Sequence, residues 1–354
     1  MTAATAGRPF TAGGWGRLAW PAWRQHRAAL AGFAVVSGVL AAVMLWAALA
    51  GHAHYTALVR DHCPGSRQLA RCGPLLGDFP WLENSNYDIA VTWMARAGPV
   101  LAGVFLGAPA LARDYERGTA RFTWTQGTSR TRWALANMLV LAVPVVAVSA
   151  GLGALAIWSL QPLTALGQAS RWQGSFDGTP VTLAAWMLFA FLLGVTIGAA
   201  LRRVVPAMAA TGGAVTVLVL VNAWRLHGLL LTTGAVVSRT RLLAGQFYTL
   251  PLTNVATYFF GGSVARAPAG SWVLDGWFAD RGGHRLTGAA LNPLYARKAP
   301  QQQAWVASQH ASVWISYQPG RHFWVLQGLE GGVLLVLALA LATTTVILIR
   351  RSST

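Results

Sequence analysis

The chain has 354 residues, of which 55% are hydrophobic and only 10% are charged. A soluble domain carries about 25% charged residues, so the composition excludes an ordinary soluble protein and indicates one embedded in a membrane. The net charge of +17 does not indicate nucleic-acid binding. The arginines are spread between apolar runs and form no basic stripe with base-stacking aromatics.

Residues 1–27 place arginines among tryptophans, including Arg24 and Arg27 beside Trp20 and Trp23. This mixture is typical of a helix that lies in the headgroup layer of a membrane. A disordered basic tail is the alternative for this segment.

Six apolar runs are long enough to cross a hydrocarbon core of about 30 Å. They cover residues 28–50, 89–111, 133–160, 181–201, 204–224 and 323–349. The sequence therefore predicts an all-α membrane protein with six transmembrane helices and an N-terminal interfacial helix. Five spans fall within residues 28–224, and the sixth span and a short tail make up residues 323–354. Between them, residues 225–322 are too polar to span and are long enough for a small folded subdomain outside the cell.

The orientation follows from the basic residues. Arginine is much denser in segments 1–27, 112–132, 202–203 and 350–354 than in the long segments that alternate with them. Basic residues near the ends of spans favour the cytosolic side. Both termini are therefore predicted to be cytosolic.

The two cysteines of the chain, Cys63 and Cys72, lie in the first predicted outer segment. An oxidising exterior permits a disulfide between them. His52, His54 and His62 lie nearby and raise a metal site as an alternative. Their spacing fits no recognised ligand pattern, so no metal site is predicted.

Two charges fall inside predicted spans. Arg96 lies seven residues from the outer end of the second span, and Glu330 lies seven residues from the outer end of the last. Both are thus about 10 Å deep, where a lone charge is costly. We expect them to form an intramembrane ion pair; the alternative is that each side chain snorkels separately to the headgroups.

Two spans carry glycines spaced four residues apart, Gly103 with Gly107 and Gly194 with Gly198. This spacing permits close contact between transmembrane helices.

The segment between the second and third spans, residues 112–132, is short, charged and too small to form a core of its own. Its arginines surround the only close pair of acids, Asp114 and Glu116, and Gly118 allows a sharp turn. We predict one or two helical turns on the cytosolic membrane face. The acids at the start would suit the partial positive charge of a helix N-terminus.

This segment also resembles the first cytosolic loop of type-2 ABC exporter permeases, in the form common in actinobacteria. Residues 23–27 and 317–330 resemble the segments before the first and last spans of the same family. The residues that match in the loop are Asp114, Glu116, Gly118, Thr119, Thr125, Gln126, Ser129, Arg130 and Trp133.

The resemblance implies that the loop contains a coupling helix that docks on a separate ATPase subunit. The residues expected at that contact are Arg113, Asp114, Glu116, Arg117, Gly118, Thr119 and Arg121. It further implies two ATPase subunits, which bind ATP and Mg, and a second permease, identical or related, that pairs through the first, second and fifth spans. The location implied is a bacterial plasma membrane, and the activity is efflux of a substrate that the sequence does not name.

No catalytic site is predicted. The chain has no P-loop, since its sole lysine, Lys298, stands in Arg-Lys-Ala-Pro, and it has no H-E-x-x-H motif. Two other classes stay open: a membrane-embedded enzyme, and a sensor or scaffold, either of which would use residues 225–322.

Overall fold

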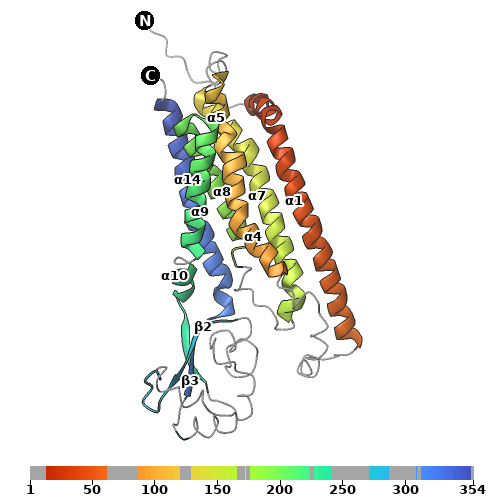
Figure 1. Ribbon diagram of the computed structural model, residues 1–354, viewed down its shortest axis with the longest axis vertical. Coiled ribbons are helices and arrows are strands. Elements are labelled where there is room, and N and C mark those ends of the chain that lie inside the picture. The colour runs from red at the N-terminus through yellow and green to blue at the C-terminus, as the bar shows by residue number, and fades with distance from the viewer. Residues whose placement is uncertain are drawn as a thin grey trace.

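A computed structural model describes residues 13–61, 86–119, 129–165, 172, 176–223, 227–240, 271–286, 308 and 312–351. Within these residues, six helices are long and apolar enough to cross a membrane. They form an elongated bundle with a small sheet beyond one end (Figure 1). The prediction of a mainly helical membrane protein with six spans is confirmed.

The bundle has two distinct ends. The helix α1 begins and α14 finishes at one end, which we call the terminal end, and the opposite end, next to the strands, is the sheet end (Figure 1). The helices are α1 (Gly13–Asp61), α4 (Asn86–Leu101), α5 (Ala108–Glu116), α7 (Arg130–Ala165), α8 (Pro180–Leu201), α9 (Val204–Val221), the short α10 (His227–Thr232) and α14 (Phe323–Arg351).

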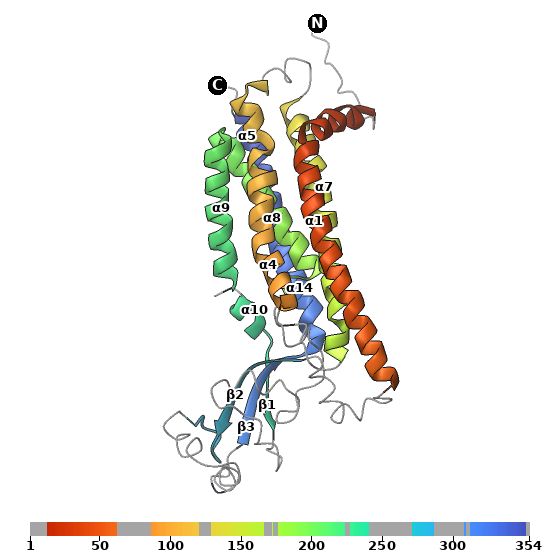
Figure 2. The same cartoon turned by 45° about the vertical axis from the view of Figure 1, so that its right-hand side comes forward.

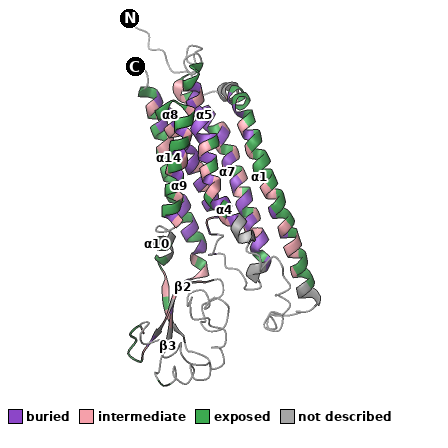
Figure 3. Ribbon diagram, viewed as in Figure 1, coloured by how far each residue is buried: buried purple, intermediate pink, exposed green. Residues whose placement is uncertain are grey.

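The first turns of α1 lie across the terminal end, and the rest of the helix runs along the bundle (Figure 2). Trp20 and Trp23 in this part are exposed. Both features agree with a segment that lies in the headgroup layer before the first span begins. Along its length α1 packs chiefly on α7, and most of its surface is exposed (Figure 3).

The second span is interrupted by a π-helical turn, η2 (Ala102–Gly107), between α4 and α5. Pro109 lies at the start of α5. Proline has no N–H and therefore cannot donate to the carbonyl of Phe105, so regular α-helical bonding cannot continue through this position. Isolated π turns of this kind are frequent at functional sites.

The central helix is α8, which packs against α4, η2, α5, α7, α9 and α14. Its glycines meet those of the second span. A side chain at Gly103 would come within 2.8 Å of the Ala190 carbonyl oxygen, and one at Gly194 within 2.8 Å of the Ala108 nitrogen. The close contact predicted from both glycine spacings is confirmed, and the two motifs pack on each other.

Part of residues 225–322 forms an antiparallel sheet of three strands in the order β1–β3–β2. The strands are β1 (Val236–Thr240), β2 (Trp272–Ala279) and β3 (Ser312–Gln318). The prediction of a small subdomain did not specify strands. A tight turn follows β2, where a hydrogen bond from the His284 backbone N–H lowers the pKa of Asp280.

The sheet is anchored to the bundle by aromatic side chains. Trp172 stacks on Trp272 of β2, with ring centroids 5.9 Å apart, and meets Phe323 at the start of α14 edge-on at 5.2 Å. Phe176 completes this cluster. The short helix η5 (Gly320–His322) then joins β3 directly to α14.

Candidate functional site

At the terminal end, the last turn of α5 holds the acid pair predicted to lie at the coupling contact. Asp114 is buried, with 6% of its surface exposed. Its Oδ1 accepts a hydrogen bond from Gln25 Nε2 of α1 and another, at 3.3 Å, from the Thr119 hydroxyl. The Asp114 carboxylate therefore links the start of α1 to the end of the second span.

Beside this contact, α1 is also joined to α7. The Nε2 atom of the buried His26 lies 3.0 Å from Asn137 Oδ1, and Asn137 Nδ2 donates to the Trp133 carbonyl at 2.9 Å. A buried polar pair of this kind fixes the position of one helix against the other, because separation would leave both groups unsatisfied.

Glu116 makes a different connection. Its Oε2 accepts a hydrogen bond of 2.8 Å from the backbone N–H of Val204, the first residue of α9. A carboxylate at this position satisfies a free donor and complements the partial positive charge of the helix N-terminus. Sequence reasoning placed Glu116 at a partner surface and missed this capping role.

The turn between α8 and α9 packs against Tyr115, which lies between the two acids in the last turn of α5. The Arg202 guanidinium lies 5.6 Å from the centre of the Tyr115 ring. Arg202 adopts a left-handed conformation, with φ 56°, that ends α8 and redirects the chain. Tyr115 in turn meets Trp133 of α7 edge-on, with ring centroids 6.4 Å apart.

The last turn of α5 thus contacts α1, α7 and the α8–α9 turn. Arg350 of α14 reaches the same end, where its Nε donates to the Thr131 hydroxyl of α7 at 3.2 Å. We call these contacts around Asp114, Tyr115 and Glu116 the terminal-end cluster.

The remaining residues predicted at the coupling contact differ in how far they are exposed. Arg117, Gly118 and Thr119 are exposed, while Arg113 is half-buried. Gly118 has φ +74°, which confirms that a glycine makes the turn here. Arg121 lies outside the described residues.

A second polar cluster lies inside the spans towards the sheet end. Glu330 of α14 is 4% exposed, and its Oε1 accepts hydrogen bonds from Trp186 Nε1 at 3.0 Å and Asn222 Nδ2 at 3.4 Å. Arg96 is exposed on α4. Both side chains are described, and no ion pair forms between them, so the predicted pair is not observed.

One turn before Glu330, the fully buried Gln327 joins α14 to α8. Its Oε1 accepts hydrogen bonds from the hydroxyls of Thr179 and Thr182, and its Nε2 donates to the Phe176 carbonyl at 2.8 Å. Sequence reasoning missed this clamp. The available signal was a glutamine within an apolar span, where polar side chains usually find a partner.

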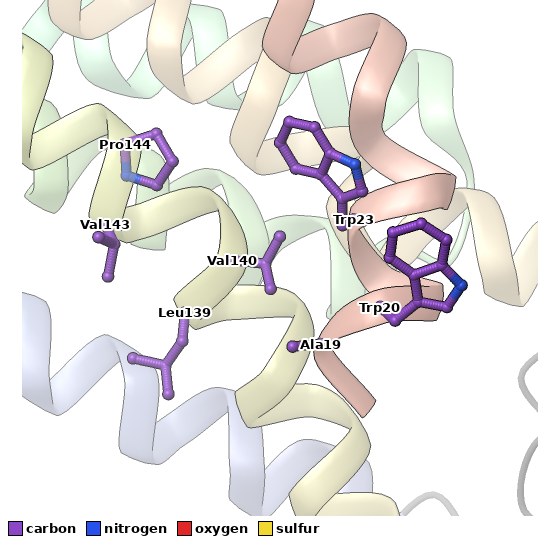
Figure 4. Close-up of a pocket in the computed structure, with 7 residues that line it drawn as sticks. All are labelled: Ala19, Trp20, Trp23, Leu139, Val140, Val143 and Pro144. Carbon is purple, nitrogen blue, oxygen red and sulfur yellow. The ribbon is translucent and has the colours of Figure 1, made fainter. Parts of the chain in front are cut away.

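An apolar groove of about 580 Å³ lies between the first turns of α1 and the side of α7 (Figure 4). Its walls are Trp20 and Trp23 with Leu139, Val143 and Pro144, among others. Tryptophans are suited to the boundary between lipid chains and headgroups. The groove therefore fits the lipid side of a helix that rests on the membrane surface.

The structure describes only part of the chain around the histidines near the predicted disulfide. His52 stacks on Trp158 with ring centroids 4.5 Å apart, and its Nε2 is 3.0 Å from the Trp158 carbonyl oxygen. In the described part of the chain no three potential ligands gather to hold a metal ion. Cys63, Cys72 and His62 lie outside the described residues.

The comparison with known proteins decides the family. A family profile described as "ABC-2 membrane transporter related" matches residues 34–226, which is more than half of the chain. The chain belongs to the ABC-2 membrane transporter related family. No curated protein and no solved structure matches it.

The ABC-2 match begins within α1 and extends just beyond α9, so it covers the first five spans. Six apolar helices and this family identify a multi-pass membrane protein that serves as a permease component of an ABC transporter. ABC ATPase partners follow from membership of the ABC-2 family. The resemblance noted in the sequence is confirmed at the level of the ABC-2 permeases.

Proposed function

We propose that the chain is the membrane subunit of an ABC exporter in a bacterial plasma membrane, with the terminal end and both termini in the cytosol. Two ATPase subunits, which bind ATP and Mg, dock on residues 113–119. A second permease, either another copy or a related chain, completes the transporter. This chain supplies the path through the membrane, and its partners hydrolyse ATP.

The observation that carries the proposal is the terminal-end cluster. The last turn of α5 contacts α1 through Gln25 and Asp114, α9 through Glu116 and Val204, and α7 through Tyr115 and Trp133. A partner that pushes on this turn therefore acts on three helices at once. An isolated surface loop would transmit no such force.

The same turn leads into the membrane without a break in the chain. The α5 helix continues into η2, where α-helical hydrogen bonding changes, and both elements pack closely on α8. A push along α5 would deform η2 and so displace α8 and α9, which pack against it. Movement of these helices would switch the transport path between its inward-open and its closed or outward-open states. Closure of the ATPase subunits, driven by ATP, would supply the force.

Exposed apolar surface supports the pairing with a second permease. In the apolar windows of α1 and α9, only 17% of residues are buried within the chain. Large apolar side chains such as Val36, Val43, Val205 and Val217 are exposed there. We propose that parts of both helices face the second permease, beside the second span.

The test is purification of the tagged full-length chain from its native host, with captured proteins identified by mass spectrometry. We expect an ABC ATPase to be recovered. Arg117→Glu should reduce that recovery more than tenfold, because charge reversal within a contact places like charges together. Arg321→Glu, an exposed reversal at the sheet end, is the matched control and should have no effect.

Glu116 provides a second arm in reconstituted vesicles. Glu116→Arg should uncouple ATP hydrolysis from transport, because it removes the acceptor at the start of α9 and adds a positive charge beside the helix N-terminus. Glu116→Gln keeps an acceptor and should retain most coupling. Normal recovery of the ATPase with Arg117→Glu, together with full transport by Glu116→Arg, would exclude docking on this turn.

A further inference from the structure

Only one oxygen of the Glu330 carboxylate has hydrogen-bond partners among the described residues. Its Oε1 accepts both hydrogen bonds, from Trp186 and Asn222, while the buried Oε2 has no hydrogen-bond partner. A buried carboxylate in a membrane span is costly unless its charge and acceptors are matched. The described side chains therefore leave the Glu330 carboxylate only partly compensated.

A cavity of about 100 Å³ lies beside this group, at the sheet end of the spans. It is lined by Thr92, Ala95 and Arg96 of α4, Trp172, Phe176 and Asp177 of the segment before α8, and Ala223 after α9.

Glu330 lies behind one wall of the cavity. Its hydrogen-bond donor Asn222 precedes the wall residue Ala223, and Gln327, one turn earlier on α14, holds the carbonyl of the wall residue Phe176. Asp177 is also close enough to interact electrostatically with Glu330. One carboxyl group, that of Asp177, therefore lines the cavity, and a second, that of Glu330, lies behind it.

The charges around the cavity are of both signs. Arg96, on the α4 side, makes no ion pair with another described residue and is exposed, so the cavity opens towards the surface there. Its guanidinium suits a phosphate or carboxylate. Asp177 suits a cation that can donate hydrogen bonds, and the charge of Glu330 behind the wall adds to the attraction. The rings of Trp172 and Phe176 add surfaces favourable to a cation.

We propose that this cavity binds a zwitterion with a primary ammonium group and a phosphate, of the phosphoethanolamine class, either free or as a lipid headgroup. The ammonium lies on the side of Asp177 and Glu330, and the phosphate lies on Arg96. An ammonium can donate hydrogen bonds to a carboxylate and a trimethylammonium cannot, which favours the ammonium. The proposal rests on the function proposed above and gives that transporter a class of substrate.

The test uses the full-length chain without an ATPase, so it does not depend on coupling. Native mass spectrometry of the chain in detergent, titrated with phosphatidylethanolamine, phosphatidylcholine or phosphatidylglycerol, measures lipid binding. Soluble O-phosphoethanolamine, followed by thermal unfolding, separates a free ligand from a lipid headgroup. We expect phosphatidylethanolamine to bind at least tenfold more tightly than either of the other lipids.

Two variants test the two charges. Glu330→Gln keeps the shape and an oxygen acceptor but removes the charge, and Arg96→Gln removes the cation from an exposed position. Arg96→Gln should weaken binding by about tenfold to a hundredfold, the usual effect of losing a hydrogen bond to a charged group. Glu330→Gln should weaken it less, by about threefold to tenfold, because Glu330 does not line the cavity and acts on the ammonium through its charge alone. Arg321→Gln is the control, and the unfolding temperature without ligand confirms that each variant folds.

Equal binding of the three lipids would overturn the proposal, as would binding that survives both Glu330→Gln and Arg96→Gln. A response to O-phosphoethanolamine alone would support a free ligand, and a response to the lipid alone would support a headgroup. Failure here with normal recovery of the ATPase would remove the ligand class and leave the proposed exporter intact.

Discussion

The neighbouring spans α8 and α9 differ more in burial than in composition. Both windows have a mean hydropathy of 2.1, yet 61% of residues are buried in α8 and only 17% in α9. Hydropathy measures how readily a helix enters a bilayer. It does not say whether the helix faces protein or lipid, because lipid chains are as apolar as leucine.

The difference comes from where small residues allow backbones to approach. In α8, Gly194 and Gly198 lie against the backbone of the second span, where a side chain would collide with main-chain atoms. In α9, a side chain at Gly213 would meet no atom within 4 Å. In a membrane, dispersion contacts of this close kind replace the hydrophobic effect as the main attraction between helices.

The largest predicted effect compares these glycines directly. Gly194→Leu should destabilise the protein by about 3 kcal/mol, because main-chain atoms of η2 and α5 cannot move aside as a flexible side chain can. Gly213→Leu should be neutral or stabilising by up to about 1 kcal/mol, since glycine is a poor helix former. Titration with a denaturing detergent in mixed micelles measures both. Equal losses would show that α8 is not held by close backbone packing.

A smaller effect is expected where α8 meets α14. Gln327→Leu should cost about 1–3 kcal/mol, because it leaves the buried hydroxyls of Thr179 and Thr182 without their acceptor. Thr343→Val is the control, since that exposed hydroxyl bonds only to the carbonyl of Leu339 in its own helix. The same detergent titration applies, and an unchanged midpoint for Gln327→Leu would show that the clamp is unimportant.

The smallest effect compares one threonine in each helix. Thr211 of α9 is fully buried and its hydroxyl has no hydrogen-bond partner, so Thr211→Val should be neutral or stabilising by up to about 1 kcal/mol. Thr196 of α8 lies 2.9 Å from the Thr345 hydroxyl of α14, so Thr196→Val should destabilise by about 1 kcal/mol. Thermal unfolding in nanodiscs distinguishes a gain in stability from a loss. A loss of stability in Thr211→Val would show that the Thr211 hydroxyl makes a hydrogen bond in the membrane-embedded protein.

The candidate site was predictable in part. The segment around the end of the second span was marked by its arginines, by the acids Asp114 and Glu116, and by the turn at Gly118. The acids were expected at the start of a helix, and that expectation was wrong, because both lie in the last turn of α5. Their partners Gln25 and Val204 were not predictable, because they are 89 and 88 residues away in the chain. Such contacts depend on how helices rotate about their axes, and an apolar span gives little information on rotation when every face is apolar.

The charges within the spans show the same limit. Equal depth and opposite sign suggested an ion pair between Arg96 and Glu330. In the structure, Trp186 and Asn222 donate to Glu330 instead, and Arg96 lines a cavity with Asp177. Depth follows from the count of residues along a helix, whereas the partner depends on which faces the other helices present.

The sequence alone determined the number of spans, the glycine spacings that permit close packing, and the loop that resembles the ABC exporters. Each is a local property, set by length, periodicity or residue order. The tertiary structure decided that α8 is central, that Glu116 caps α9, and that strands form beyond the spans. These depend on contacts between distant segments. In a bilayer the fit between helix surfaces selects them, because hydropathy does not distinguish a buried helix such as α8 from an exposed one such as α9.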